Sequence, residues 1–173
     1  AELSTNNLDY KYIKEKAVDL EQKEPSKELK IVFEKLKKEG INCYYGNWDI
    51  EGKPNTILVD FKNIISKKDE LKAWFWNNYK IDSLKANWDF EEPMLWSYAV
   101  GRLLRELELV LQNKKMVGQF HEWMSGFPIL YLDHNNSNIG TVFTTHATML
   151  GRTMCGSGEN LYDLLDSINP EER

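Results

Sequence analysis

The chain has 173 residues, of which 42% are apolar and 28% are charged, and its formal net charge is −5. This length is typical of one folded domain, and the composition excludes a disordered or fibrous chain. The acidic balance argues against a nucleic-acid-binding domain, which carries a basic surplus, and no apolar run is long enough to cross a membrane.

Two helices are predicted before residue 40. In residues 1–25, apolar side chains recur at roughly helical spacing and Pro25 ends the pattern, which predicts a helical arm or linker. Residues 26–38 predict a second helix that Ser26 caps and that Gly40 ends. One apolar stripe supports it, formed by Leu29, Val32, Phe33 and Leu36.

Two strands follow this helix. Residues 41–45 are apolar at alternate positions, and residues 56–61 form a nearly continuous apolar run. The sequence between them, at 51–55, has the composition of a turn. The pattern predicts a β-ribbon or a strand–loop–strand unit, with the second strand buried on both faces.

The middle of the chain predicts two more helices. The first begins at Ser66, with Asp69 as its capping partner, and buries Leu71, Trp74 and Phe75. After a polar connection at 80–90, Pro93 is placed in the first turn of a long helix. The apolar stripe of that helix is wide enough to predict burial on most sides, and it comprises Trp96, Ala99, Val100, Leu103, Leu107 and Val110.

Strands and helices alternate in the last part of the chain. Strands are predicted at 116–120 and 139–144, and helices at 122–132, at 146–154 and from 161 to 165. Such alternation is typical of βαβ units with a parallel sheet. The fold class predicted from the sequence is therefore α/β, with helices flanking a parallel sheet.

Two histidines follow the last two predicted strands. His121 comes directly after the first of them and His146 after the second, and each precedes a predicted helix. Ligands of α/β proteins bind at the carboxyl ends of strands, and helix N-termini favour anions. The two histidines are therefore expected to face one cleft suited to a phosphate or to sugar hydroxyls. The alternative is that each is a structural residue.

Other candidates near these histidines also have two interpretations. Glu122 could act as a general acid or base, but a first-turn carboxylate that stabilises the helix dipole is the favoured interpretation. Arg152 could reach a phosphate or simply lie near a helix end. Exposed indoles can stack on sugars, although helical spacing favours the core for Trp74, Trp76, Trp88 and Trp96. His134 lies in a polar stretch and is expected to be exposed.

Several motifs are absent from the sequence. It contains no GxGxxG fingerprint, no GxSxG nucleophile elbow and no HExxH zinc helix. The two cysteines, Cys43 and Cys155, have no CxxC partner. We therefore expect no metal and no cofactor. So few cysteines are typical of the reducing cytoplasm, which is the expected location.

Two long motifs resemble the glycogen synthase family. Residues 119–126 read Gln-Phe-His-Glu-Trp-Met-Ser-Gly, and residues 141–152 read Thr-Val-Phe-Thr-Thr-His-Ala-Thr-Met-Leu-Gly-Arg. A third stretch at 45–61, which begins Tyr-Gly-Asn-Trp, is similar to another family element. The resemblance covers about residues 40–165.

The resemblance implies a retaining glycosyltransferase of the GT-B fold, in which two Rossmann-like halves face a cleft. Such enzymes transfer glucose from UDP-glucose or ADP-glucose to the non-reducing end of an α-1,4-glucan without a metal. Residues 26–173 would then be a partial Rossmann-like N-terminal domain that bears the acceptor side. The family's Lys-x-Gly-Gly loop and its C-terminal nucleotide-binding domain are missing from this sequence.

The resemblance also implies roles for individual residues. His121 matches the histidine beside the transferred glucose, where it would bind a sugar hydroxyl and stabilise a developing oxocarbenium ion. Substrate-binding residues would be Gly126, His146 and Arg152. Supporting residues that hold the loops would be Glu122, Trp123 and Thr145.

Two functions remain open at this point. One is a synthase fragment that is inactive alone, because transfer needs both sides of the cleft. The other is a non-catalytic module, derived from a synthase half, that binds glucan or regulates a partner. The expected partners are the glucan acceptor, the nucleotide-sugar donor and the missing C-terminal domain, with no nucleic acid and no membrane. A truncated sheet would also expose an edge or a face, which predicts self-association.

Overall fold

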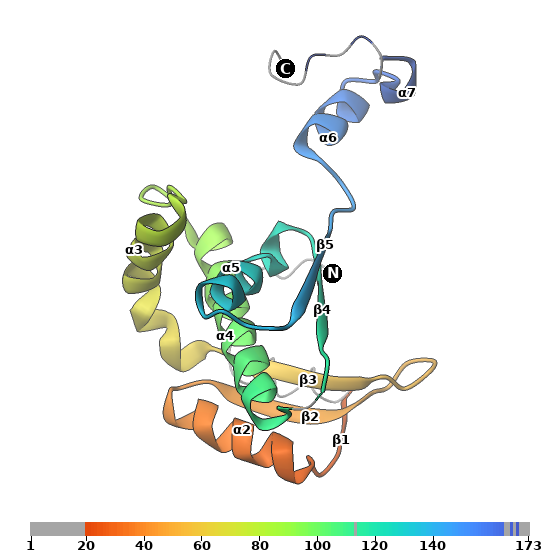
Figure 1. The fold of residues 1–173 in the computed structure, drawn as a ribbon. Coiled ribbons are helices and arrows are strands. Elements are labelled where there is room, and N and C mark those ends of the chain that lie inside the picture. Colours follow the sequence, from red (N-terminus) through yellow and green to blue (C-terminus); the bar gives the residue numbers. More distant parts are fainter. Residues whose placement is uncertain (1–19, 113, 165–166, 168, 170–173) are drawn as a thin grey trace.

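The computed structural model describes residues 20–112, 114–164, 167 and 169, and it has two small sheets with helices around them (Figure 1). The antiparallel sheet has the order β1-β2-β3, and the parallel sheet pairs β4 with β5. The strands are β1 (Leu20–Gln22), β2 (Asn42–Trp48), β3 (Asn55–Asp60), β4 (Val117–His121) and β5 (Gly140–Thr144). The α-helices are α2 (Lys27–Lys38), α3 (Lys68–Tyr79), α4 (Trp88–Val110), α5 (Phe127–His134), α6 (Met149–Gly156) and α7 (Leu161–Leu164), and two 3₁₀ helices are η2 (Lys62–Lys67) and η3 (Trp123–Ser125).

Helix α2 confirms the prediction for residues 26–38. The Ser26 side chain accepts a hydrogen bond from the Leu29 amide at 3.3 Å, so it caps the first turn. Val32 and Leu36 on the predicted stripe are buried. The chain leaves the helix through Gly40, whose φ of +91° is a conformation that glycine adopts without strain.

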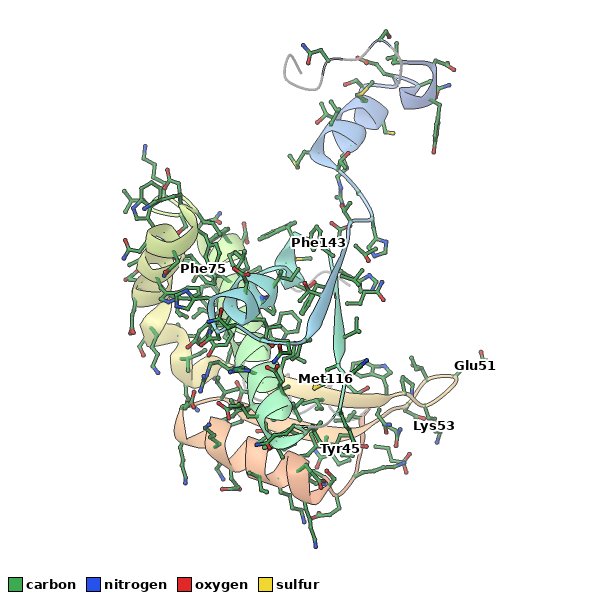
Figure 2. The ribbon with its side chains drawn as sticks, in the orientation of Figure 1. Tyr45, Glu51, Lys53, Phe75, Met116 and Phe143 are labelled. Carbon is green, nitrogen blue, oxygen red and sulfur yellow. The ribbon has the colours of Figure 1, made fainter. Side chains whose placement is uncertain are left out.

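Strands β2 and β3 confirm the predicted ribbon. They pair antiparallel from Asn42 opposite Asp60 to Asn47 opposite Asn55, and the tip with Glu51 and Lys53 projects from the body (Figure 2). The expectation that the second strand is buried on both faces is wrong, because only Asp60 of β3 is fully buried. The reason is that the core packs against one face of β3, the face that carries Ile57 and Val59.

Strand β1 corrects part of the prediction of a helical arm or linker at residues 1–25. Leu20 to Gln22 form a strand that pairs antiparallel with β2, with Leu20 opposite Trp48 and buried. A free sheet edge supplies backbone hydrogen bonds that local side-chain spacing does not reveal. The rest of the predicted arm, residues 1–19, lies outside the described residues.

Helix α3 begins later than predicted, and α4 begins earlier. Ser66 lies inside η2 and does not cap α3, which starts at Lys68. Helix α4 starts at Trp88, so Pro93 lies within the helix and not in its first turn. An Asp60 carboxylate oxygen accepts a hydrogen bond from the Lys62 amide at 2.9 Å. This bond turns the chain directly after β3, which explains why helical structure begins before Ser66.

Helix α4 is buried on several sides, as predicted, and packs against α2, α3 and α5. Its buried residues are Glu91, Met94, Leu95, Ser97, Ala99, Gly101, Leu103 and Glu106. Trp96 is 36% exposed and Trp76 of α3 is 48% exposed, so the core assignment of these two tryptophans is wrong. The neighbouring elements cover other positions of the two helices.

One hydrophobic core joins α2, α3, α4 and the start of α5, with Phe75 fully buried in it (Figure 2). Arg102 of α4 reinforces this arrangement. Its guanidinium donates to both carboxylate oxygens of Glu39, at 2.9 and 2.5 Å, and to the Tyr131 hydroxyl at 2.6 Å. Because these partners lie at the end of α2 and in α5, one side chain ties three helices together.

Residues 117–144 form a βαβ unit, which confirms the α/β fold class. Strands β4 and β5 are parallel, and α5 connects them and covers one face through Phe120, Leu132 and Ile139. The predicted helix over 122–132 is instead the short η3 followed by α5, because Gly126 and Pro128 shift the helix start to Phe127. Helices α6 and α7 extend away from the body (Figure 1). No helix among the described residues is long and apolar enough to span a membrane.

Candidate functional site

The candidate site lies at the carboxyl ends of β4 and β5. His121, the last residue of β4, is paired in register with Thr144, the last residue of β5. The Glu122 amide then donates to the Thr144 carbonyl at 2.9 Å, and the Gln119 side chain donates to the Thr144 hydroxyl at 3.0 Å. Because the two parallel strands end at the same level, the segments that follow them start side by side.

The two histidines are in direct contact. His121 Nδ1 lies 2.8 Å from His146 Nε2, and the ring planes differ by 9° with centroids 5.1 Å apart. The two nitrogens are much closer to each other than the two ring centroids are, and they lie between the centroids. The contact is therefore an in-plane N–H···N hydrogen bond and not a face-to-face stack, with one nitrogen donating and the other accepting. Both side chains are exposed, so a ligand can reach them.

Neither histidine opens an α-helix, which corrects the expectation of an anion site at a helix N-terminus. Glu122 and then η3 follow His121. Helix α6 begins at Met149 and is capped by Thr148, whose hydroxyl accepts from the Gly151 amide at 3.0 Å. One amide of the first turn of α6, that of Gly151, is thus already capped, and His146 precedes this turn.

Glu122 links the two segments that carry the histidines. Its carboxylate oxygen Oε1 accepts from the backbone amide of His146 at 2.5 Å and from that of Ala147 at 3.1 Å. Its own φ is +64°, a left-handed conformation that is uncommon for a residue other than glycine. The favoured prediction of a helix first-turn carboxylate is wrong, because the carboxylate binds the backbone of the other segment.

Two serines that the sequence analysis did not select fix the segment after β4. The Ser125 hydroxyl donates to the His121 carbonyl at 2.5 Å. Ser97, fully buried in α4, donates its hydroxyl to the Met124 carbonyl at 2.7 Å. A serine within the otherwise apolar stretch of α4 was the signal available in the sequence, because a buried hydroxyl requires a partner.

The remaining residues of the first motif pack around this segment. Trp123 is 49% exposed and lies parallel to Phe90, with centroids 6.2 Å apart. A Cβ atom on Gly126 would lie 3.3 Å from the Trp123 carbonyl oxygen and 3.4 Å from Phe143, which is labelled in Figure 2. The glycine therefore allows this close approach of the segment to β5.

The second motif divides between the site and α6. Thr145 donates its hydroxyl to the Ala147 carbonyl at 3.3 Å, next to the amides that Glu122 holds. Arg152 lies on α6, is exposed, and belongs to the part of the chain that projects from the body (Figure 1). The structure thus brings together His121, Glu122, Trp123, Gly126, Thr145 and His146, and it leaves Arg152 apart.

The side chains of this site can form hydrogen bonds with a ligand. Each imidazole uses one nitrogen in the pair and keeps the other for a ligand such as a sugar hydroxyl or a phosphate. Among the described residues, no group of three or more His, Cys, Asp or Glu side chains is placed to hold a metal ion.

Comparisons with known proteins point to one family. A family model described as glycogen synthase matches residues 8–173. The chain is 34% identical over 150 residues to a glycogen [starch] synthase of Neurospora crassa, an alignment that covers 86% of this chain and 21% of that protein. It is 32% identical over 135 residues to isoform 2 of the Saccharomyces cerevisiae enzyme, covering 78% of this chain and 19% of that protein.

The alignments cover most of this chain but only a small part of each relative. A glycogen [starch] synthase of Dictyostelium discoideum is 30% identical over 139 residues, which is 80% of this chain and 16% of that protein. The chain thus spans about a fifth of the length of the curated relatives that it matches. Since the family model covers nearly all of the sequence, the chain belongs to the glycogen synthase family.

Proposed function

We propose that this chain is the acceptor-side part of the N-terminal half of a GT-B glycosyltransferase. The enzyme would transfer glucose, with retention, from UDP-glucose or ADP-glucose to the non-reducing end of an α-1,4-glucan. The observation that carries this proposal is the contact between His121 and His146 at the ends of two parallel strands. Both residues lie in the motifs that resemble the family, and strand ends are where α/β proteins bind ligands.

In this proposal His121 is the catalytic residue. Its free nitrogen would bind a hydroxyl of the transferred glucose, and its dipole would stabilise the positive charge that develops on the sugar. His146, Gly126 and Arg152 would contact substrate, and Glu122, Trp123 and Thr145 would hold the segments around it. The location of Arg152 on the projecting α6 means that its part requires α6 to approach the other residues.

The 173-residue chain alone is expected to be inactive. Transfer requires donor and acceptor to be held together, and the family resemblance implies that most donor contacts come from a C-terminal half, outside the acceptor-side part proposed here. Incubation with radiolabelled UDP-glucose or ADP-glucose and glycogen should incorporate no more label than a blank without protein. Incorporation above the blank would contradict the proposal that this chain is only one side of the cleft.

The role of His121 is tested by His121→Ala in a full-length synthase that contains this segment. Loss of a positioned electrostatic group should lower kcat by about 100- to 1000-fold. The matched control is His134→Ala, since His134 is exposed and contacts Trp74 with centroids 4.9 Å apart. Equal loss of activity in the two variants, or loss of folding with His121→Ala, would overturn the assigned role.

A second candidate function is a non-catalytic glucan-binding module. Trp76 favours it, because this half-exposed indole borders a cavity of about 540 Å³. The lining of that cavity combines apolar and hydrogen-bonding groups from α3 and the next connection, namely Asp69, Lys72, Ala73, Trp76, Asp82, Ser83 and Leu84. Affinity electrophoresis in glycogen-containing gels should show retardation of the chain that Trp76→Ala removes. Unretarded migration of the unsubstituted chain would exclude this function.

A further inference from the structure

The Glu122 carboxylate lies at the point where the pairing of β4 with β5 ends. The last backbone bond between the two strands joins the Glu122 amide to the Thr144 carbonyl. Beyond it, the Glu122 side chain continues the connection by accepting from the amides of His146 and Ala147, 24 and 25 positions away in the sequence. One residue therefore links the two segments through both its backbone and its side chain.

This link fixes the backbone that carries His146. With its amide held at 2.5 Å from Glu122 Oε1, the Cα of His146 has little freedom to move relative to β4. From that position the His146 ring reaches His121 with a nitrogen–nitrogen distance of 2.8 Å. Both histidines are exposed in the described part of the chain, so burial contributes little to holding the two rings together. The strand register brings the two segments side by side, and the bonds from Glu122 fix the second segment there.

The contact between the rings couples their hydrogens. Two neutral imidazoles carry two N–H groups in total, and one of these lies between His121 Nδ1 and His146 Nε2. The other must lie on one of the two outward nitrogens, His121 Nε2 or His146 Nδ1. A neutral pair therefore presents one donor and one acceptor to a ligand. Transfer of the bridging hydrogen to the other ring exchanges these two roles only when the outward hydrogen is also lost from one ring to solvent and another is gained from solvent by the other ring.

We propose that Glu122 is a positioning residue whose carboxylate oxygen holds His146 against His121, so that the two imidazoles act as one unit with coupled tautomers. The inference deepens the proposed function, and its importance for glucose transfer rests on that function. The contact between the two histidines can be tested without an activity assay. Glu122 acts here as a hydrogen-bond acceptor. A role as general acid or base would instead require its ionisable proton.

The test uses two variants that separate these roles. Glu122→Gln keeps an amide oxygen that can accept both backbone hydrogen bonds but removes the ionisable carboxyl. Glu122→Ala removes the acceptor. Glu34→Ala is the control, because Glu34 is an exposed glutamate on α2. All are measured in the 173-residue chain labelled with ¹⁵N at histidine, near pH 8, where ordinary imidazoles are neutral.

The readout is the protonation of each ring nitrogen by NMR. The chain has only three histidines, so His134 serves as an internal reference for folding through its contact with Trp74. In the unsubstituted chain, in Glu34→Ala and in Glu122→Gln, exactly one of the two facing nitrogens should carry hydrogen. In Glu122→Ala, His121 and His146 should each return to the averaged tautomers of a free imidazole, while His134 is unchanged.

Three results would overturn the inference. One is averaged, independent tautomers of His121 and His146 in the unsubstituted chain. The second is an unchanged pair in Glu122→Ala, which would mean that Glu122 does not position His146. The third is loss of the pair in Glu122→Gln with His134 unchanged, which would mean that the charge matters and not the acceptor. If Glu122→Ala also changes the His134 signals, that variant no longer tests the positioning role. The tautomers of the unsubstituted chain and of Glu122→Gln can then still overturn the inference by the first or the third result.

Activity separates this inference from the proposed function. In a full-length synthase that contains this segment, Glu122→Ala should lower kcat by about 10- to 100-fold with little change in KM. Glu122→Gln should keep most of the kcat of the unsubstituted enzyme. If the NMR results hold while kcat is unchanged, the positioning role stands and the catalytic role of the pair fails. If both variants lose activity equally while the pair persists in Glu122→Gln, the positioning role stands, but the lost activity comes from a further acid or base role of the glutamate.

Discussion

Glu91 is a buried carboxylate that joins α4 to α3. Its Oε1 accepts hydrogen bonds from the ammonium groups of Lys72 at 2.9 Å and Lys68 at 3.2 Å, and its side chain is 9% exposed. The hydrogen bond from Lys72 is the main reason that the pKa of Glu91 lies below its ordinary value of 4.5, and Lys68 adds to the effect while burial opposes it. A depressed carboxylate pKa means that the ionised form stabilises the fold.

Replacement of Glu91 by Gln should lower the free energy of unfolding at pH 7 by about 1–3 kcal/mol, because charge-assisted hydrogen bonds in a buried site are lost. The stabilisation by Glu91 is fully present above its unfolded pKa, near 4.5, and is lost as the pH falls through the lower folded value. The difference between the variant and the unsubstituted chain should therefore shrink below about pH 4.5. Urea unfolding at pH 7 and pH 3 measures it.

The control for this prediction is Glu70→Gln, because Glu70 is an exposed glutamate on α3, the helix that carries Lys68 and Lys72. It should change stability by less than about 0.5 kcal/mol at either pH. A difference for Glu91→Gln that is as large at pH 3 as at pH 7 would show that the ion pairs with Lys68 and Lys72 are not its cause.

Single residues also show which features of the site could be predicted from the sequence and which could not. The positions of His121 and His146 after two strands were predictable, because the strands have recognisable apolar patterns. The partner of Glu122 was not, since the amides that it binds lie 24 and 25 positions away. Helix-end statistics favoured a dipole role for Glu122, but its carboxylate binds the backbone amides of His146 and Ala147.

At the scale of elements, β1 depends on a glycine in its neighbour. A Cβ atom on Gly46 would lie 2.3 Å from the Glu21 carbonyl oxygen, which is far inside van der Waals contact. The backbone of β1 therefore approaches β2 more closely than any residue with a side chain would allow. Because backbone atoms form the contact, no side-chain rotation can relieve it.

Gly46→Ala should therefore displace β1 from the sheet. We expect a loss of about 1–3 kcal/mol in unfolding free energy. We also expect faster hydrogen exchange at the Lys23 amide, which donates to the Tyr45 carbonyl at 3.0 Å. Gly156→Ala in α6 is the control, since a Cβ there meets nothing within 4 Å. Unchanged exchange at Lys23 in Gly46→Ala would show that β1 tolerates the side chain.

Elements defined by local signals were predicted well. Ser26 and the apolar stripe of α2, and the turn between β2 and β3, lie within a few residues of the structure that they specify. The starts of α3 and α6 were not predicted correctly because other local hydrogen bonds set them: the Asp60 carboxylate turns the chain into η2, and Thr148 caps α6. The start of α4 was placed too late. Strand β1 was missed because only its pairing with β2, a distant segment, makes it a strand.

At the scale of the whole molecule, no helix among the described residues packs on one face of the parallel sheet. Helix α5 packs on the face that contains Phe120, whereas Val117 and Val142 on the other face are 73% and 47% exposed. Within the described part of the chain, β4 and β5 each pair with one strand only. Exposed strand edges and apolar sheet faces recruit other chains.

We therefore expect the chain to self-associate through this face. Light scattering should show an average mass that rises with protein concentration, and Val142→Lys should reduce the rise by placing a charge on the face. Ile31→Lys is the control, because Ile31 is 59% exposed on α2 and lies outside the parallel sheet. A monomer at all concentrations, or an equal effect of both substitutions, would contradict the expectation.

The sequence by itself determined the family, the α/β class, the hairpin and the βαβ unit. It could do so because the family depends on sequence motifs, and each helix, strand and turn depends on the spacing of residues close together in the sequence. Only the tertiary structure decided that His121 and His146 touch, that Glu122 holds the backbone of the second motif, that Trp76 and Trp96 are exposed and that Arg152 lies apart. The physical reason is that these outcomes depend on which distant segments pack together, and local propensity carries no information about such contacts.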